Sequence, residues 1–151
     1  MNIIVKPQGS DLCYCRPDTT WERESKDFYV PDYIKEMYWA PVVFVRISKA
    51  GKCINPKFVS RYYDSYNFGT LLYGQPAEGT GLISYMDHTS LLPSPMLGLE
   101  DLKEEHRELL EDAICKASML ISVRIGDYVA VELDEIRQLD PNAAKEFMVI
   151  F

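Results

Sequence analysis

Residues 87–90 place an acid, an imidazole and two hydroxyls next to one another, which are side chains of the kind used in nucleophilic catalysis. A catalytic triad, however, is assembled from side chains that meet in space, and neighbours along an extended chain point to opposite faces. Asp87 and His88 therefore indicate a polar turn rather than a catalytic centre.

Cysteines are the next candidates for chemistry. Cys13 and Cys15 alternate as in a strand, which places both thiols on one face and could provide half of a metal site. No second Cys or His pair lies at the spacing of a zinc site, so two small core residues are the better interpretation. The sequence also contains neither a Gly-x-Gly-x-x-Gly motif nor a phosphate-binding P-loop.

Length and charge limit the classes of protein to which this chain can belong. With 151 residues, it is expected to form one domain, residues 1–151, with a core of its own. The formal net charge of −7 repels phosphate backbones, which argues against nucleic acid as a partner. No apolar run reaches about 18 residues and the start lacks a signal-peptide core, so we expect a cytoplasmic protein that does not insert into a membrane.

The longest apolar segment, within residues 30–47, is the element on which the other segments are expected to pack. Residues 42–45 are β-branched or aromatic and apolar on both faces, which is typical of a strand that is covered on both sides. Pro41 lacks an N–H, so it belongs at the start of a strand, at a bulge or at an edge. Further strands are predicted at residues 3–5, 12–15, 28–30, 70–73, 82–85, 121–125, 128–133 and 147–151.

Two helices are predicted between these strands. Asn55 followed by Pro56 predicts a helix that continues to residue 67, because asparagine caps helices and proline suits their first turn. Apolar residues at three- and four-residue steps predict a longer helix over residues 99–120. Strands before and after one long helix, without regular alternation, predict an α+β domain that is mainly β.

Three stretches carry a resemblance to a known family. They are Arg-Pro-Asp-Thr-Thr at residues 16–20, the central strand with the turn and helix after it at residues 28–64, and Met-Leu-Ile-Ser-Val-Arg-Ile-Gly-Asp-Tyr at residues 119–128. Their order and spacing resemble the fumarylacetoacetate hydrolase family, above all its compact bacterial members. The resemblance implies a mixed β-roll or flattened barrel with a few peripheral helices, usually a homodimer. It also implies chemistry on 2-oxo or β-diketo acids with Mg²⁺ or a similar cation held by carboxylates.

The resemblance further implies where such a site would lie. The two glutamates of the family's Glu-x-Glu metal pair fall on Ala40 and Val42, and the next metal-binding aspartate falls on Leu71. The substrate-polarising lysine falls on Tyr85, and the substrate-binding Thr-Gly-Thr-Pro segment aligns around Leu133. Because none of these five side chains can do the family's chemistry, we predict a vestigial pocket without catalytic, cofactor-binding or metal-binding residues.

Three hypotheses follow. The first is a non-catalytic relative without a cofactor, which acts as a binding module or structural partner, in a homodimer or beside an active paralogue. The second is a divergent hydrolase, isomerase or decarboxylase of 2-oxo or β-diketo acids with Mg²⁺ in a rearranged site. The third is an unrelated small α+β protein. The acids and the histidine that could form a rearranged site are Glu36, Asp64, Asp87, His88 and Glu132.

Overall fold

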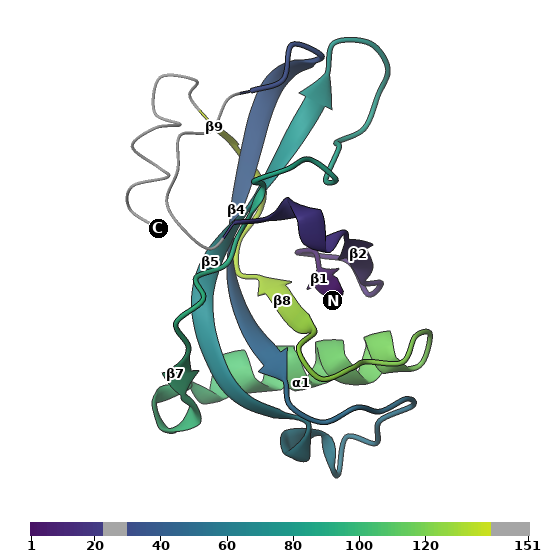
Figure 1. The fold of residues 1–151 in the computed structure, drawn as a ribbon, viewed down its shortest axis with the longest axis vertical. Helices are drawn as coiled ribbons and strands as arrows, with labels where there is room; N and C mark the ends of the chain where they lie inside the picture. The colour runs from purple at the N-terminus through teal and green to yellow at the C-terminus, as the bar shows by residue number, and fades with distance from the viewer. Residues whose placement is uncertain (23–29, 140–151) are drawn as a thin grey trace.

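The computed structural model describes residues 1–22 and 30–139, and within them the chain forms a curled nine-stranded sheet with one α-helix (Figure 1). The strand order is β2-β1-β8-β4-β5-β6-β3, with β9 beside β4 and β7 beside β5. The strands are β1 (Ile3–Lys6), β2 (Tyr14–Arg16), β3 (Trp21–Glu22), β4 (Ile34–Ile47), β5 (Tyr63–Pro76), β6 (Ser90–Leu91), β7 (Leu97–Gly98), β8 (Tyr128–Glu132) and β9 (Arg137–Leu139). The helical elements are η1 (Asp18–Thr20), η2 (Val59–Arg61), η3 (Leu99–Asp101) and α1 (Glu104–Ser118). The predicted mainly-β α+β roll with few helices is confirmed.

β4 is the centre of the sheet, as the apolar segment within residues 30–47 predicts. β5 pairs antiparallel with nearly all of β4, while β8 and β9 pair with its other edge one after the other. Pro41 lies between these two partners, and its carbonyl accepts a hydrogen bond of 2.8 Å from the backbone N–H of Leu133. In an antiparallel strand, both backbone groups of a residue face the same edge. The missing N–H of Pro41 therefore faces the gap between β8 and β9, and no bond to β5 is lost.

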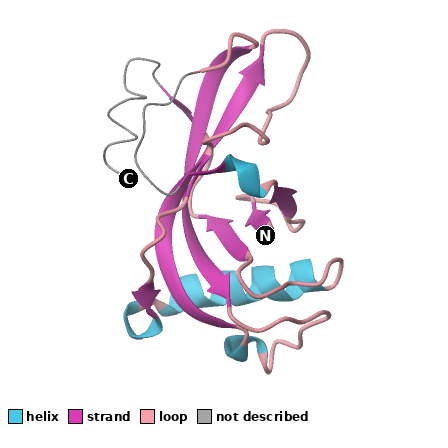
Figure 2. Cartoon of the chain, viewed as in Figure 1, coloured by secondary structure: helices cyan, strands magenta, loops and turns pink. Residues whose placement is uncertain are grey.

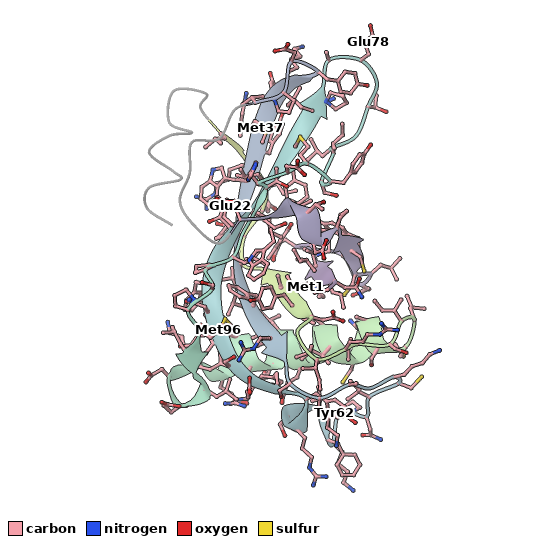
Figure 3. The ribbon with its side chains drawn as sticks, in the orientation of Figure 1. Met1, Glu22, Met37, Tyr62, Glu78 and Met96 are labelled. Atoms are coloured by element: carbon pink, nitrogen blue, oxygen red, sulfur yellow. The ribbon has the colours of Figure 1, made fainter. Side chains whose placement is uncertain are left out.

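The paired strands β4 and β5 run the length of the molecule and curve around β8 and the N-terminal strands (Figure 1). Glu78 lies near one tip of this long pair and Tyr62 near the opposite end (Figure 3). Their curvature gives the sheet a concave side, in which β1 and β8 lie (Figure 1). Among the described residues, no helix is long and apolar enough to cross a membrane.

Both faces of the sheet are buried around residues 42–45, which explains why this part of the central strand is apolar without alternation. Val43, Val45 and Ile47 of β4 face α1, which lies across one side of the sheet (Figure 2). The alternate residues of β4 face the other side, toward the segment around Trp21. This second layer, here called the inner layer, consists of Ile3, Val5, Ala40, Val42, Phe44, Leu71, Tyr73, Leu92, Tyr128 and Ala130.

The helix predicted from Asn55 to residue 67 is wrong. Asn55 does begin a turn, because its side-chain Oδ1 accepts the N–H of Lys57 at 2.9 Å, but this turn leads only into η2. Phe58, on the expected apolar face of the helix, is 44% exposed. From Tyr63 onward the chain pairs with β4, and this pairing outweighs the local capping signal.

Other elements differ from the predictions mainly in length. The long helix begins at Glu104 rather than at residue 99, because η3 precedes it. Two of the predicted strands, at residues 82–85 and 121–125, reduce to one isolated bridge each, at Ile83 and Val123. The predicted strands that lie mostly or wholly outside the described residues are those at residues 28–30 and 147–151.

Tyr63 connects the start of β5 to α1. It is 3% exposed, and Arg107 Nη1 donates a hydrogen bond of 3.2 Å to its hydroxyl. Burial raises the pKa of Tyr63 from 10.0 to about 12, and the charge of Glu111 adds to this rise while Arg107 opposes it. The native state therefore holds this proton more tightly than the unfolded chain does. The resulting stability is complete below pH 10 and is lost as the pH rises toward 12.

Raising the pH from about 10 to about 12 is therefore expected to lower the free energy of unfolding by about 2–3 kcal/mol through Tyr63 alone. Denaturant unfolding measured at intervals across this range checks the prediction. In the Tyr63→Phe variant the decrease should be smaller by that amount. Identical pH dependence of the two proteins would contradict the assignment.

Candidate functional site

The three positions that the resemblance implies as metal ligands do come together. Ala40 and Val42 lie on the same face of β4, and Ala40 is the direct partner of Leu71 on β5. All three side chains are 0% exposed and belong to the inner layer. The positions thus converge as ligands would have to, but their side chains form part of a packed apolar core.

The other two implied positions lie elsewhere. Tyr85 is 70% exposed, in the loop after β5, and Leu133 packs against the cluster on the α1 side of the sheet. The structure therefore brings together three of the five predicted pocket residues. The role of all five as remnants of an active site stays a prediction.

Glu132 brings a carboxylate to the same place. It is the last residue of β8 and the direct partner of Val42 on β4, and it is 2% exposed. Its Oε2 accepts the backbone N–H of Gln8 at 3.0 Å, and its Oε1 accepts the hydroxyl of Tyr73. Both carboxylate oxygens thus have protein donors.

A chain of hydrogen bonds joins this carboxylate to a buried cation. Arg16 Nε lies 3.0 Å from the hydroxyl of Tyr14, which lies 2.7 Å from the hydroxyl of Tyr73, which in turn reaches Glu132. Burial raises the pKa of Tyr73, and the nearby Tyr14 adds to this rise, so Tyr73 keeps its proton. We call the four residues Arg16, Tyr14, Tyr73 and Glu132 the Arg–Tyr–Tyr–Glu chain.

The guanidinium of Arg16 is buried and forms hydrogen bonds through Nε, Nη1 and Nη2. The residue is 1% exposed, and its guanidinium lies 4.6 Å from the centroid of the Tyr73 ring. Nη2 donates to the carbonyl of Leu72 at 2.8 Å, and Nη1 donates to the carbonyl of Thr89 at 3.1 Å. Nη1 also lies 3.4 Å from the hydroxyl of Ser90. A charge this deeply buried is tolerated because its donors are paired and an opposite charge lies at the other end of the chain.

These residues do not fit the divalent cation that the resemblance implies. Mg²⁺ and Mn²⁺ prefer oxygen ligands, mostly carboxylates, at short distances. Ala40, Val42 and Leu71 offer aliphatic carbon, and the carboxylate of Glu132 is already hydrogen-bonded. Within residues 1–22 and 30–139, no group of three or more His, Cys, Asp or Glu side chains could hold a metal ion.

Comparison with known proteins identifies the fold. No family model matches the sequence, and no curated protein matches it. Solved structures do match: a fumarylpyruvate hydrolase from Pseudomonas aeruginosa, in complex with Mn²⁺ and pyruvate, superposes with a TM-score of 0.73 at 9% identity, over 93% of this chain and 81% of that one. The chain has the fumarylacetoacetate hydrolase fold.

Two further structures with this fold are similar to the chain. A protein from Yersinia pestis CO92 assigned to the fumarylacetoacetate hydrolase family gives a TM-score of 0.74 at 12% identity, covering 92% of this chain and 83% of that one. Maleylpyruvate hydrolase from Sphingobium sp. SYK-6, in complex with manganese(II) and pyruvate, gives 0.74 at 11% identity, covering 91% of this chain and 62% of that one. The fold that the sequence resemblance implied is thus confirmed, which rules out the hypothesis of an unrelated α+β protein.

Within residues 1–22 and 30–139, the five candidates for a rearranged site include no group of three or more that could hold a metal ion. Glu36 accepts a hydrogen bond of 2.9 Å from the neighbouring Tyr38, and Asp64 lies 4.0 Å from Arg46 at the surface. Asp87 is exposed, His88 pairs with Glu22, and Glu132 belongs to the Arg–Tyr–Tyr–Glu chain.

Glu22 and His88 form a second polar pair, which the sequence did not predict. Glu22 is 6% exposed, and its Oε2 lies 3.0 Å from His88 Nδ1. His88 adopts a φ of 64°, and its side chain is half exposed. Asp87 and His88 therefore form the predicted turn, although Ser90 already belongs to β6, and the imidazole meets an acid that is distant in the sequence.

Sequence analysis missed the roles of Tyr14 and Arg16, although a signal was present. The two residues alternate with Cys13 and Cys15, so they share the opposite face of the strand. Cys13 is partly buried but Cys15 is exposed, so the two thiols are not a pair of core residues as predicted. An arginine on the buried face of an edge strand is unusual enough to mark a polar network, but the sequence does not say which face is buried.

Proposed function

We propose that this chain is a non-catalytic, divergent member of the fumarylacetoacetate hydrolase family, in which a packed core and the Arg–Tyr–Tyr–Glu chain occupy the metal position. The observation that carries the proposal is the set of aliphatic side chains at Ala40, Val42 and Leu71, each 0% exposed. A cation at this place would receive no oxygen ligand from any of these three positions.

The charges on this face support the same conclusion. The negative charge of Glu132 and the positive charge of Arg16 offset each other through the hydroxyls of Tyr73 and Tyr14. A divalent cation would have to displace Tyr73 from Glu132 and would lie close to the guanidinium of Arg16. Lost hydrogen bonding and Coulomb repulsion both oppose its binding.

The role that fits such a domain is recognition rather than chemistry. A fold without the catalytic ligands still presents a curved sheet with loops at its rim, and loops on a rigid scaffold commonly carry binding functions. We therefore propose a binding module that acts as a homodimer or beside an active paralogue.

Titration calorimetry with Mg²⁺ and Mn²⁺ tests the proposal. The native chain and the Glu132→Gln variant should both show no binding at micromolar to millimolar metal, because neither offers a set of free carboxylates. With Mn²⁺ present, the chain should not hydrolyse fumarylpyruvate or maleylpyruvate, the compounds after which the two similar hydrolases are named. Micromolar Mn²⁺ binding that Glu132→Gln abolishes, or metal-dependent hydrolysis, would contradict the proposal of a non-catalytic domain without a metal site.

A further inference from the structure

A cavity of about 400 Å³ opens directly beside the Arg–Tyr–Tyr–Glu chain. This volume lies in the range of small-molecule sites. Its walls come from the N-terminal strands, β5, the loop after β5 and the segment between β8 and β9. The residues that line it are Pro7, Tyr14, Tyr73, Leu82, Ser84 and Ile136.

Arg16 and Glu132, at the two ends of the Arg–Tyr–Tyr–Glu chain, fix the directions in which the two tyrosine hydroxyl protons point. Arginine can only donate hydrogen bonds and an ionised carboxylate can only accept them. Since Arg16 donates to Tyr14, and Tyr73 donates to Glu132, the proton of Tyr14 must point to Tyr73. Both hydroxyl protons are therefore used within the Arg–Tyr–Tyr–Glu chain. Toward a ligand, each tyrosine oxygen can only accept a hydrogen bond.

This arrangement decides what the cavity can recognise. Leu82, Ile136 and Pro7 provide apolar walls, and the polar groups are the hydroxyl of Ser84 and the two tyrosine oxygens, which are acceptors without free protons. A carboxylate would lose its hydration in the cavity and would receive no hydrogen bond from these two oxygens, because both partners are acceptors. A cation would approach the buried guanidinium of Arg16, which opposes it.

We propose that the cavity binds a neutral, mainly apolar small molecule that carries an O–H or N–H donor, such as a phenol or an indole. The donor points at the hydroxyl oxygens of Tyr14 and Tyr73, and the ring lies against the apolar walls. The inference rests on the proposed function, because a metal bound at Glu132 would release the proton of Tyr73 and change this selectivity.

The test is a ¹H–¹⁵N NMR titration of the native chain with four probes: phenol, anisole, benzoate and pyruvate. Phenol should shift the amide signals around Tyr14, Tyr73 and Ser84. Anisole has the same ring but no donor, and it should bind about five- to tenfold more weakly, the effect of one hydrogen bond. Benzoate and pyruvate should leave these signals unchanged.

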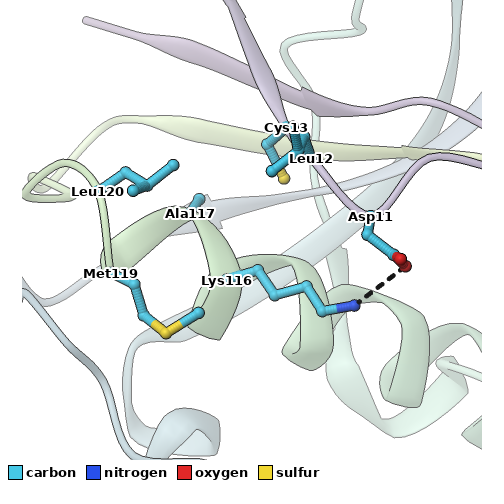
Figure 4. A pocket seen from close by; sticks show the side chains of 7 residues that line it. All are labelled: Asp11, Leu12, Cys13, Lys116, Ala117, Met119 and Leu120. Atoms are coloured by element: carbon cyan, nitrogen blue, oxygen red, sulfur yellow. Dashed lines mark ion pairs between the residues drawn. The ribbon is translucent and has the colours of Figure 1, made fainter.

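A second cavity supplies an internal control. It has a volume of about 210 Å³ and lies between the loop before β2 and the C-terminal end of α1 (Figure 4). Apart from the ion pair of Asp11 and Lys116 at 3.6 Å, its lining is mainly apolar (Figure 4). Signals from Leu12 and Leu120, which line this cavity, should respond to phenol and anisole alike.

Two variants keep the test specific. Ser84→Trp fills the proposed cavity while leaving all four residues of the Arg–Tyr–Tyr–Glu chain in place, and it should abolish the phenol-induced shifts around Tyr14 and Tyr73. Ser60→Trp, at an exposed position of η2, should leave those shifts unchanged. Tyr14→Phe frees the Nε–H donor of Arg16, so anisole, which can only accept a hydrogen bond, should bind this variant more tightly than it binds the native chain.

Each outcome decides between the two proposals. At the signals around Tyr14, Tyr73 and Ser84, equal affinity for phenol and anisole, preference for benzoate or pyruvate, or no response to millimolar phenol would overturn the cavity proposal and leave the non-catalytic assignment intact. Pyruvate binding that requires Mn²⁺ would overturn the non-catalytic assignment as well.

Discussion

Replacing Arg16 with methionine is expected to lower the free energy of unfolding by about 3–5 kcal/mol, the cost of leaving a buried opposite charge uncompensated. Methionine keeps most of the length of the side chain, so the main change is the loss of charge and donors. Glu132 remains buried with no opposite charge in the chain, and the carbonyls of Leu72 and Thr89 lose their donor. Urea unfolding followed by circular dichroism measures the change.

Arg46 is the matched control. It is exposed, and its guanidinium lies 4.0 Å from the carboxylate of Asp64 at the surface. Arg46→Met should change stability by less than about 1 kcal/mol. Combining Arg16→Met with Glu132→Leu should cost less than the sum of the two single changes, because the paired charges then disappear together. Additive costs, or similar effects at Arg16 and Arg46, would contradict the coupling of Arg16 to Glu132.

Leu71→Ala is the second large effect, expected to cost about 2–5 kcal/mol because it opens a cavity in the inner layer. Leu97→Ala is its control, since Leu97 is 44% exposed on β7, and it should cost less than about 1 kcal/mol. Thermal and denaturant unfolding of the two variants give the comparison. A small cost at Leu71 would mean that this position borders a solvent-filled pocket rather than a packed core.

Leu71→Asp extends this prediction to the metal question. The variant restores the residue type that the family resemblance implies at this position, but it buries a charge among aliphatic side chains. It should be destabilised more than Leu71→Ala, and adding Mg²⁺ or Mn²⁺ should not restore its stability. Recovery of stability with millimolar Mn²⁺ would show that a latent metal site survives around Glu132.

The central strand and its two buried faces could be predicted from the sequence. Val42 to Val45 are apolar without alternation, and a strand of this kind has to be covered on both sides. The resemblance placed Ala40, Val42 and Leu71 at one site, and strand pairing does bring these three together. The register of β4 against β5 could not be predicted from this pattern, because a strand that is apolar on both faces still buries apolar side chains after a shift of one residue.

The polar features could not be predicted in the same way. Arg16 and Glu132 lie near opposite ends of the chain and meet through Tyr14 and Tyr73, and no local pattern records such long-range contacts. The failure at Asn55 has a related cause. Its capping signal is local and weak, whereas the pairing of β5 with β4 extends over most of both strands and determines the structure.

The central claim is that packed side chains and the Arg–Tyr–Tyr–Glu chain occupy the place of the metal. Anomalous diffraction from crystals soaked in MnCl₂ tests this most directly, because Mn²⁺ is located without assuming its ligands. We predict no manganese peak beside Ala40, Val42 and Leu71, with Arg16, Tyr14, Tyr73 and Glu132 joined as described. A manganese peak at this position, coordinated by Glu132 with Tyr73 displaced, would contradict the account.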